Sequence, residues 1–365
     1  MNIGIPKERR PFESRVGLSP AGVEILTQHG HMVYVEHEAG IGAGFDDREF
    51  EIAGARLVYS PEEVFVRADL MLKVARPTVE ELNWLRPKTA LAGLLHLASA
   101  REDKTQILLE KRITSIAYEQ IELPDGSLPV LRPFSQIGGK MSASIAARLL
   151  QNNWGGKGML LGGIPGVPPA EVVILGGGVV GMCATTVFLG LGAHVTVIDR
   201  ELDVLQQVFN RFPNVVTMLS TSRNIERATA FADVVVGAVL VTGERTPILI
   251  TREMMRAMKS RSVFIDVSID QGGCAETSRP TTHDQATYIE EGVIHYCVPN
   301  MPGVVARTAT HAFVNAGLPY ILQIANLGPD GAITQNPAIE KAVNTHDGKL
   351  VHLTLLSKGG HDGLD

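Results

Sequence analysis

The chain has 365 residues and a formal net charge of −6, and this length is more than one hydrophobic core usually serves, so two domains are expected. Lys and Arg number 33 against 39 Asp and Glu, without a long basic run, so neither nucleic acid nor an anionic membrane is expected as a partner. The apolar runs are short and interrupted by charges, and the first eight residues lack the pattern of a signal peptide. Neither export nor membrane insertion is therefore expected.

The three cysteines, Cys183, Cys274 and Cys297, are odd in number and lack CxxC spacing. They indicate neither a disulfide framework nor a zinc site. Each is interpreted as a small buried hydrophobic residue. This usage fits a reducing compartment, and we predict a cytoplasmic protein.

Short apolar strands alternate with helices in the first part of the chain, which is an α/β pattern. Ser19 and Pro20 predict the start of a helix, and Ser60 begins a short helix with capping-box character. Lys73 and His96 lie toward the ends of strands, where ligands of parallel sheets gather, so both are candidate site residues. Strands are predicted over residues 3–5, 32–35, 70–74, 90–95 and 114–118, and helices over 20–28 and 101–111.

The periodicity of residues 135–152 predicts a helix, which is expected to bridge the two domains. Residues 155–169 are rich in Gly and Pro and are expected to form a loop. After residue 200 the alternation of helices and strands continues. Helices are predicted over 202–209, 224–231, 251–258 and 307–326, and strands over 215–219, 234–241, 263–267 and 295–298.

The segment 171–200, EVVILGGGVVGMCATTVFLGLGAHVTVIDR, predicts a dinucleotide site. The apolar run 172–175 is typical of a strand that is buried on both faces. Gly176, Gly178 and Gly181 follow as GxGxxG: the first makes a tight turn, the second lets backbone approach a pyrophosphate, and the third lets helix and strand pack closely. The helix that begins there would direct its N–H groups and its dipole toward the phosphates.

Asp199 follows a second apolar strand, 195–198, where a carboxylate can accept hydrogen bonds from the adenosine ribose. Because a carboxylate repels a 2′-phosphate, NAD is favoured over NADP as the cofactor. In some dinucleotide sites an arginine in the position of Arg200 accommodates such a phosphate, but a solvated side chain is the simpler interpretation of Arg200. The context of strand, helix and acid favours dinucleotide binding over a plain glycine turn.

The predicted fold is therefore α/β with two Rossmann-like domains. The substrate domain is expected to comprise residues 1–128 and 308–365, and the NAD-binding domain residues 129–307. The last part of the chain would return through the long helix to the N-terminal domain.

Several segments, taken together, resemble the alanine dehydrogenases, and the resemblance covers nearly the whole chain. They are KERRPFESRVGLSP (7–20), DLMLKVARP (69–77), LLHLA (94–98), GGIPGV (162–167), IDVSIDQGGCAETSRPTTHD (265–284) and HYCVPNMPGVVARTAT (295–310). The resemblance implies reversible, NAD-dependent oxidative deamination of L-alanine to pyruvate and ammonium, with hydride transfer to nicotinamide in a cleft between the domains. It also implies a homo-oligomer, usually a hexamer and less often a dimer.

The resemblance implies four residues for substrate binding and chemistry. Arg15 and Lys73 match the family's substrate-binding residues, and His96 and Asp270 match its acid–base groups. On the residues alone, Arg15 would be a surface arginine and His96 a satisfied core histidine. Lys73 lies in an apolar strand, where an ammonium must be paired or functional. Asp270 is expected to end the strand that begins at Val263, with its carboxylate at the carboxyl edge of the sheet before a Gly-Gly turn.

The family's cofactor contacts carry over in the same way, and several of them would act through backbone. Together with the three glycines, the implied NAD contacts are Ser135, Val179, Val180, Asp199, Ser220, Val239, Leu240, Val267, Ser268, Ile269, Asp270, Arg279, Val298, Pro299, Asn300 and Met301.

Two departures from the family adjoin its substrate. Leu94 stands where many members have an aromatic residue and Phe134 where they have Met, which indicates a repacked pocket of similar volume. Another small L-amino acid is therefore an alternative substrate. Two other kinds of protein remain as alternatives to an amino-acid dehydrogenase. One is the transhydrogenase domain, whose usual Arg-Ala-Gln segment is absent near residues 132–136, and the other is a non-catalytic NAD-binding relative. A metal position of some relatives would need Glu and His where Gln323 and Leu327 stand, so no metal is predicted.

Overall fold

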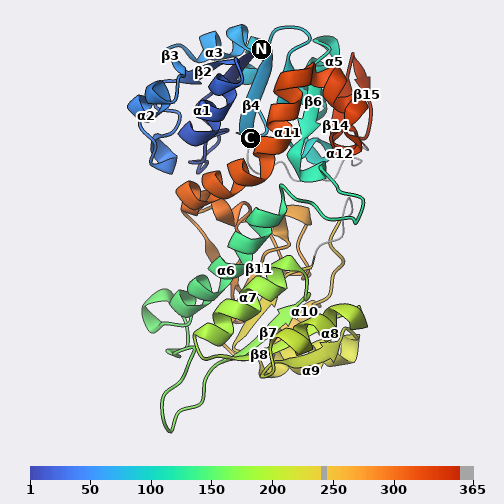
Figure 1. Cartoon of the computed structure of the whole chain (residues 1–365). Helices are drawn as coiled ribbons and strands as arrows, with labels where there is room; N and C mark the ends of the chain where they lie inside the picture. The colour runs from blue at the N-terminus through green and yellow to red at the C-terminus, as the bar shows by residue number, and fades with distance from the viewer. Residues whose placement is uncertain (240–244, 354–365) are drawn as a thin grey trace. The chain divides into compact units, whose positions relative to one another are not determined.

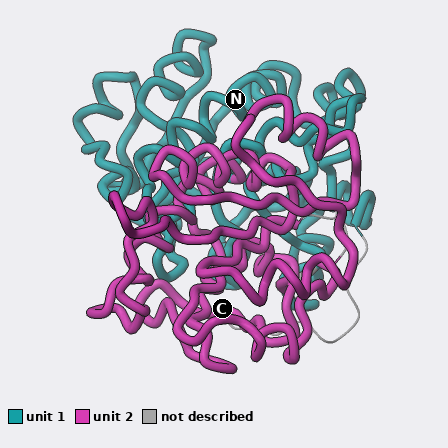
Figure 2. Tube along the Cα trace, turned by 90° about the horizontal axis from the view of Figure 1, so that it is seen from below, with its two compact units in different colours: residues 1–134, 302–365 teal, residues 135–301 magenta. Residues whose placement is uncertain are grey.

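The computed structural model describes residues 1–239 and 245–353 and divides into two compact units (Figures 1 and 2). The first unit comprises Met1–Phe134 and Pro302–Asp365, and the second comprises Ser135–Met301. Leu240, one of the predicted cofactor contacts, lies outside the described residues.

Within the described residues, the first unit contains an eight-stranded sheet in the order β15-β14-β6-β5-β4-β1-β2-β3. The strands β1 to β6 run parallel, and β14 and β15 are antiparallel additions at one edge. The strands are β1 (Asn2–Ile5), β2 (Met32–Glu36), β3 (Arg56–Val58), β4 (Leu70–Ala75), β5 (Ala90–Leu94), β6 (Thr114–Ala117), β14 (Val343–His346) and β15 (Lys349–Leu350). The helices are α1 (Pro20–Gln28), α2 (Asp47–Ile52), α3 (Pro61–Arg67), α4 (Val79–Trp84), α5 (Glu102–Glu110), α11 (Ala306–Gln335) and α12 (Pro337–Lys341).

The second unit contains, in its described residues, a seven-stranded sheet in the order β12-β13-β11-β10-β7-β8-β9. Its strands are β7 (Glu171–Leu175), β8 (His194–Asp199), β9 (Val216–Leu219), β10 (Val234–Gly237), β11 (Val263–Asp266), β12 (Thr287–Glu290) and β13 (Val293–Tyr296). Its helices are α7 (Val179–Gly190), α8 (Leu202–Arg211), α9 (Ser222–Phe231) and α10 (Arg252–Ala257). The helix α6 (Arg132–Leu149) begins in the first unit and continues into the second.

The two sheets have the same topology. In each, the next two strands are added on one side of the first strand and the following three on its other side, which is the order 3-2-1-4-5-6 of dinucleotide-binding folds. The direction of winding reverses between β1 and β4 in the first unit and between β7 and β10 in the second. The predicted pair of Rossmann-like sheets is therefore confirmed, and ligands are expected outside the carboxyl ends of these strands.

The strand β7 shows why the apolar runs form these sheets. Successive side chains of a strand point to opposite faces, and Val172 and Ile174 pack into one hydrophobic cluster while Val173 and Leu175 pack into another. All four are at most 1% exposed. Full burial of each such side chain stabilises the fold by about 1.5–3 kcal/mol, so a strand covered by helices on both faces needs the continuous apolar run.

The predicted long helix is confirmed as α11, and it lies in the first unit as expected. It is longer than predicted because it consists of two helical segments that meet at Gly328, whose φ of 73° and ψ of 162° are not helical. Pro329 follows, and proline starts a helix well because it needs no N–H partner there. The predicted end at residue 326 thus lies close to the end of the first segment.

Two predicted strands are too long. The strand predicted over residues 234–241 ends at Gly237, and the strand expected to reach Asp270 ends at Asp266. It ends there because the carboxylate of Asp266 accepts the N–H of Ser268 at 3.0 Å, which turns the chain out of the sheet. Asp270 therefore lies in the 3-10 turn η5 (Ile269–Gln271) and not at a strand end.

The capping box predicted at the start of α3 is wrong. Ser60 is the N-cap residue, but its side chain accepts no capping hydrogen bond. Glu63, which should have reached back to the N-cap, instead pairs with Arg67 one turn later at 2.7 Å. Complete capping boxes occur at Asp46, before α2, and at Thr78, before α4.

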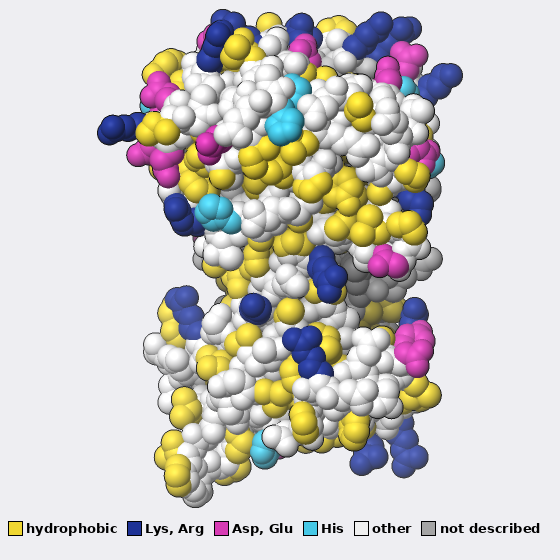
Figure 3. Space-filling view, in the orientation of Figure 1, with side chains coloured by type: hydrophobic (Ala, Val, Ile, Leu, Met, Phe, Trp, Pro, Cys, Tyr) yellow, Lys and Arg dark blue, Asp and Glu magenta, His cyan; other side chains and the backbone are white. Residues whose placement is uncertain are grey.

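The glycine-rich segment 155–169 is a loop, as predicted, and Figure 1 shows it extending from the second unit below α6. Leu160 and Ile164 on this loop are 66% and 61% exposed, and Figure 3 shows hydrophobic side chains gathered at that end of the unit. Across the described ranges, no helix has both the length and the apolar character needed to cross a membrane.

Candidate active site

The glycine turn of the second unit leaves space where a pyrophosphate would bind. A Cβ on Gly176 would lie 2.4 Å from the carbonyl oxygen of Ala238, and one on Gly181 would lie 1.9 Å from that of Gly176. A Cβ on Gly178 would meet nothing within 4 Å. The first and third glycines are thus required by packing, whereas the second keeps backbone accessible at the start of α7, where no side chain caps the helix.

Asp199 is held beside this turn at the end of β8. Its Oδ2 accepts the N–H of Gly177 at 2.7 Å, and its Oδ1 accepts the N–H of Glu201 at 2.9 Å. The carboxylate is therefore fixed at the carboxyl edge of the sheet, where a ribose would lie. Arg200 pairs with Glu201 at 3.1 Å and is 75% exposed, as expected for a solvated side chain.

The turns after β10 and β11 are joined by Ser268. Its Oγ donates to the carbonyl oxygen of Val239 at 2.8 Å and accepts the N–H of the same residue at 3.0 Å. The carboxylate of Asp266 fixes the turn after β11, because it accepts hydrogen bonds from the N–H groups of Ser268 and Cys274 and from the hydroxyl of Ser278. Burial raises the pKa of Asp266, and these three donors partly offset that effect.

Arg279 is held in place by an aromatic stack that the sequence did not indicate. Its guanidinium carbon lies 4.0 Å from the ring centroid of Tyr288, and the main-chain N–H of Arg279 donates to the Tyr288 hydroxyl at 3.0 Å. The Tyr288 ring stacks in turn on His295 at 4.8 Å. Burial raises the pKa of Tyr288 and lowers that of His295, so both rings are neutral at pH 7.

The described cofactor candidates all belong to the second unit. Those that follow strands lie at the carboxyl edge of its sheet, and the residues after β7 and β10 lie where the order of the strands reverses. Ser135 lies apart from them in sequence, in the first turn of α6. Those beyond the strand ends are Gly176, Gly178, Val179, Val180 and Gly181 after β7, Asp199 at the end of β8, Ser220 after β9, Val239 after β10, Val267, Ser268, Ile269 and Asp270 after β11, and Val298, Pro299, Asn300 and Met301 after β13.

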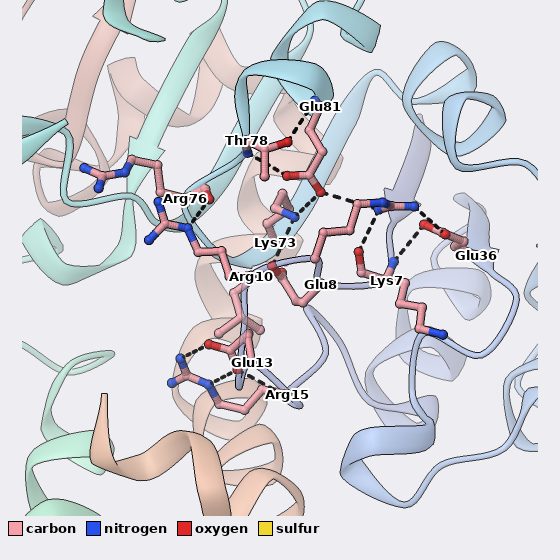
Figure 4. A network of polar contacts seen from close by, with 12 residues as sticks. Lys7, Glu8, Arg10, Glu13, Arg15, Glu36, Lys73, Arg76, Thr78 and Glu81 are labelled. Carbon is pink, nitrogen blue, oxygen red and sulfur yellow. Dashed lines mark hydrogen bonds and ion pairs between the residues drawn. The ribbon is translucent and has the colours of Figure 1, made fainter. Parts of the chain in front are cut away.

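In the first unit, Lys73 is buried and paired. Its side chain is 1% exposed in β4, and its Nζ lies 2.7 Å from Glu81 Oε1 and 3.1 Å from Glu8 Oε2 (Figure 4). Burial alone lowers the pKa of Lys73, but the two carboxylates outweigh it and the pKa stands above its ordinary value. The lysine is therefore an ammonium at pH 7, and two of its three N–H donors face carboxylates.

Arg15 is a buried arginine, so its interpretation as a surface residue is wrong. Its side chain is 4% exposed, and Glu13 accepts its Nε–H at 2.7 Å and its Nη2–H at 2.5 Å. The guanidinium carbon lies 5.1 Å from the ring centroid of Phe134, which stacks on Phe313 at 6.0 Å. The arginine is thus held between a carboxylate and an aromatic face.

His96 is not a buried core histidine, because its side chain is 55% exposed. It follows β5 in the left-handed region, with φ 43° and ψ 42°, a conformation that costs a non-glycine residue about 1–2 kcal/mol. The carboxylate of Glu119 holds the turn, since it accepts the N–H of His96 at 2.6 Å and that of Leu95 at 3.1 Å. The same carboxylate lies 3.7 Å from His96 Nδ1.

The candidates of the first unit are connected through backbone. Arg76 donates to the carbonyl oxygen of His96 at 3.0 Å, and Arg10 donates to that of Arg76 at 3.1 Å. Arg10 belongs to the segment after β1 that also carries Glu8, Glu13 and Arg15 (Figure 4). Arg15, Lys73 and His96 thus share one unit and one sheet edge, whereas Asp270 belongs to the other unit.

Sequence reasoning missed four acidic residues, each of which supports one of these candidates. The available signal was position: Glu8 and Glu13 follow β1, and Glu119 is the second residue after β6. An acid just beyond a buried strand has donors of the sheet edge within reach. Glu81 had no such signal, because it lies inside the short helix α4.

No group of three or more metal-ligating His, Cys, Asp or Glu side chains occurs in the described ranges. At the metal position of some relatives, Gln323 instead accepts a hydrogen bond from the Asn336 side chain at 2.7 Å.

Comparison with known families gives matches over both units. The model of the alanine dehydrogenase/PNT N-terminal domain matches residues 4–138, and that of the C-terminal domain matches residues 142–353. A protein of Methanococcus maripaludis named alanine dehydrogenase is 47% identical over 356 residues, which are 96% of this chain and 95% of that protein. One of Geobacillus stearothermophilus with the same name is 46% identical over 354 residues, with the same coverage.

Solved structures give the same result. A structure of L-alanine dehydrogenase matches with a TM-score of 0.93 and 46% identity, over 96% of this chain and 97% of that one. A transhydrogenase structure from Sinorhizobium meliloti matches with a TM-score of 0.82 at 25% identity, over 96% of this chain and 99% of that one.

Proposed function

Because the chain belongs to the alanine dehydrogenase/PNT family, we propose that it catalyses the reversible, NAD-dependent oxidative deamination of L-alanine to pyruvate and ammonium. The observation that carries this proposal is the match of nearly the whole chain to proteins and a solved structure named alanine dehydrogenase. The buried cations at one sheet edge and the glycine turn at the other support it independently.

Arg15 and Lys73 bind the substrate carboxylate. Lys73 keeps one N–H donor beyond those that face Glu8 and Glu81. Arg15 uses Nε and Nη2 on Glu13, which leaves the Nη1 side of the guanidinium for an oxygen of the substrate. Because both cations are nearly enclosed, a carboxylate bound there is shielded from water.

His96 and Asp270 exchange protons with the substrate nitrogen and with water. The imidazole of His96 is half-exposed and can act as an acid or a base toward the substrate. Asp270 contributes from the turn η5, which Asp266 and Ser268 hold in place. Lys73 belongs to the first unit and Asp270 to the second, so the proposed reaction needs residues of both.

NAD supplies the hydride acceptor when bound. Gly176, Gly178 and Gly181 would hold its pyrophosphate at the start of α7, and Asp199 its adenosine ribose. The carboxylate of Asp199 would repel a 2′-phosphate, and Arg200 pairs with Glu201 at 3.1 Å, so both residues favour NAD over NADP.

The proposal includes a cytoplasmic homo-oligomer, a hexamer or less commonly a dimer. The three unpaired cysteines suit a reducing compartment. Exposed Leu160 and Ile164 on the loop 155–169 are the kind of apolar surface that a second copy would cover. Light scattering on the purified protein measures the mass of the assembly directly.

A different small L-amino acid is the second candidate substrate, and two observations favour it. Leu94 and Phe134 differ from the residues usual in the family, and both side chains are buried, at 8% and 7% exposed. Phe134 also contacts the guanidinium of Arg15. A change in this ring can therefore alter the position of the carboxylate-binding arginine.

The test is incubation of the purified protein with NAD and a panel of L-amino acids, followed by NADH absorbance. We expect the highest kcat/KM with L-alanine. A higher value with another member of the panel would select the second candidate. Binding of NAD by calorimetry without turnover on any member would favour a non-catalytic relative.

A further inference from the structure

The segment that carries Arg279 is fixed at the carboxyl edge of the second sheet. The hydroxyl of Ser278 donates to the carboxylate of Asp266, which ends β11, at 2.5 Å. The N–H of Thr281 donates to the carbonyl oxygen of Cys297, which directly follows β13, at 3.0 Å. Because β11 and β13 are parallel, Arg279 lies beyond the ends of both, where the ligand of a parallel sheet is expected.

The guanidinium of Arg279 is exposed and yet held against an aromatic face. Its side chain is 62% exposed, and its carbon Cζ lies 4.0 Å from the centroid of the Tyr288 ring. Among the described residues its ion-pair partner is Glu290, at 4.0 Å, and Glu290 lies closer to Arg252, at 2.7 Å. Within the same ranges the guanidinium donates no hydrogen bond. Its N–H groups are thus available to a ligand, while the ring limits where they can lie.

Tyr288 is anchored through both its hydroxyl and its ring. The hydroxyl accepts the main-chain N–H of Arg279 at 3.0 Å and donates to the carbonyl oxygen of Thr277 at 2.7 Å. The ring stacks on His295, its cross-strand neighbour, with centroids 4.8 Å apart and an angle of 21° between the planes. Tyr288 therefore holds the side chain of Arg279 with its ring and the backbone of Arg279 with its hydroxyl.

The ring beneath Tyr288 is buried and hydrogen-bonded at both nitrogens. His295 is 0% exposed, and Phe264 contacts it edge-on at 5.4 Å. Its Nδ1 donates to the carbonyl oxygen of Val293 at 3.0 Å, so Nε2 of the neutral ring accepts the hydroxyl of Thr277 at 2.8 Å. Burial lowers the pKa of His295, and the ring adds no positive charge beneath the guanidinium. The stack of guanidinium, phenol and imidazole thus has a fixed base.

The order of the strands indicates which half of a dinucleotide Arg279 would meet. The strand β8, which carries Asp199, lies on one side of β7, and β10, β11 and β13 lie on the other. A dinucleotide binds across the point where the strand order reverses. With its adenosine ribose at Asp199, the cofactor would therefore extend its nicotinamide half over β10 and β11. A guanidinium beyond β11 can then donate to oxygen atoms of the nicotinamide ribose and its phosphate.

We propose that Tyr288 is a positioning residue of the cofactor site, which holds Arg279 ready for the nicotinamide half of NAD. This inference rests on the proposed function, because it takes Arg279 as a cofactor contact. An unrestrained arginine side chain loses rotamer freedom when it binds a ligand, whereas one already stacked on a ring loses less. The stack therefore lowers the entropic cost of binding the cofactor, and the hydroxyl fixes the backbone from which Arg279 extends.

The test is a double-mutant cycle on NAD affinity, measured by calorimetry without an amino acid. Tyr288→Leu removes the ring and the hydroxyl and should raise the Kd of NAD about fivefold to tenfold, and Arg279→Gln should raise it at least as much. Because Tyr288 acts through Arg279, adding Tyr288→Leu to Arg279→Gln should raise the Kd by less than about twofold.

The matched control is Ile289→Ala, which changes the next residue of β12. The Ile289 side chain is 66% exposed, and it lies on the opposite face of the strand from Tyr288 because successive side chains alternate. This variant should leave the Kd of NAD unchanged.

Two further measurements separate positioning of Arg279 from general bracing of the hairpin formed by β12 and β13. AMP carries only the adenosine half of the cofactor, so its Kd should be the same in the native protein and in Tyr288→Leu. In steady-state turnover the KM for NAD should rise in Tyr288→Leu with little change in kcat, because Tyr288 itself contacts no reacting atom.

Additive effects in the cycle, or an equal loss of AMP affinity, would overturn the inference, since Tyr288 would then act on the fold of the unit and not through Arg279. If Tyr288→Leu does not fold, Tyr288→Phe takes its place in the same cycle. Loss of the hydroxyl alone should raise the Kd of NAD about twofold to threefold, and additivity would again contradict the proposal.

Turnover of L-alanine by the same preparations tests the proposed function separately. Active protein whose NAD affinity is unchanged in Tyr288→Leu refutes the inference and leaves the activity standing. The expected cycle in a protein without turnover refutes the activity and leaves the role of Tyr288 standing.

Discussion

The two sheets reverse their winding in the same way but present different chemistry at the reversal. In the first unit, the edge beyond β1 and β4 carries buried charged side chains, with Lys73 and Arg15 enclosed by acids. In the second, the edge beyond β7 and β10 carries glycines and backbone groups joined by Ser268. One topology thus presents two kinds of surface: buried charged side chains, which suit the proposed small charged substrate, and accessible backbone, which suits the proposed dinucleotide.

A second contrast is between two arrays of buried charged side chains, one around Lys73 and one around Asp233. Lys73 is a cation between two acids at the carboxyl edge of its sheet. Asp233 is an acid between two cations, Lys157 at 2.6 Å and Lys259 at 3.0 Å, and it lies just before β10, at the amino edge. The position relative to the strands suggests function for the first array and structural bracing for the second.

The largest effect is expected from the acid–base groups. His96→Ala and Asp270→Asn should each lower kcat by about 10²–10⁴-fold, because each removes a group that is proposed to transfer a proton. NAD binding, measured by fluorescence titration, should stay within a factor of a few, because the glycine turn and Asp199 are unchanged. A parallel loss of NAD affinity would instead assign a structural role to these side chains.

The next effect concerns the stability of the first array. Lys73→Met leaves Glu8 and Glu81 buried without the ammonium between them, although Arg9 remains 3.5 Å from Glu81, and should lower the free energy of unfolding by about 3–5 kcal/mol. The control is Lys157→Met, after which Asp233 keeps Lys259 and the N–H of Glu171, so that the loss should be about 1 kcal/mol. Urea denaturation measures both, and equal losses would contradict the contrast between the arrays.

The glycine turn can be separated into a packing part and a binding part. Gly178→Ala adds a Cβ with no neighbour within 4 Å, so stability should change by less than about 0.5 kcal/mol while NAD affinity falls at least about tenfold. Gly181→Ala places a Cβ 1.9 Å from the carbonyl oxygen of Gly176 and should destabilise the fold by about 1–3 kcal/mol. Thermal unfolding with and without NAD distinguishes the two variants. Unchanged NAD affinity in Gly178→Ala would show that the pyrophosphate does not bind at this position.

The smallest effect is the pH dependence of the Asp233 array. Burial raises the pKa of Asp233, but hydrogen bonds from Lys157, the N–H of Glu171 and Lys259 outweigh it, and the pKa is lowered. The carboxylate therefore stabilises the fold above its unfolded-state pKa, near 4, and this contribution disappears as the pH falls through the lower folded-state value. The free energy of unfolding of the native protein, measured by urea titration, should exceed that of Asp233→Asn by about 1 kcal/mol at pH 7, a figure that already allows for solvent screening. The difference should become smaller as the pH falls below about 4. A difference that does not change with pH would show that the charge of Asp233 does not matter.

The fold was largely predictable because its signals are local. The apolar runs of β7 and β10 and the GxGxxG turn have the periodicity and spacing that physics requires. The elements that were missed, such as β12, β14 and α4, have four to six residues, and short elements depend on contacts that are distant in sequence. The end of β11 was misjudged because a side chain, Asp266, and not the hydrophobic pattern, turns the chain.

The candidate site was predictable only in part. Arg15, Lys73, His96 and Asp270 were identified through resemblance, whereas burial would have been assigned wrongly for Arg15 and His96 from their residue types alone. The acids that support them, Glu8, Glu13, Glu81 and Glu119, come from three different elements that meet only in the folded sheet. Their roles depend on distances that sequence spacing does not contain.

The reaction proposed for this chain is the oxidation of L-alanine with NAD. The most direct measurement is the amount of NADH and of pyruvate formed when the purified protein is incubated with L-alanine and NAD. We expect equal amounts of the two products, formed at a rate that falls by at least about 10²-fold in Asp270→Asn. Formation of neither product, by a protein that is folded and binds NAD, would contradict it.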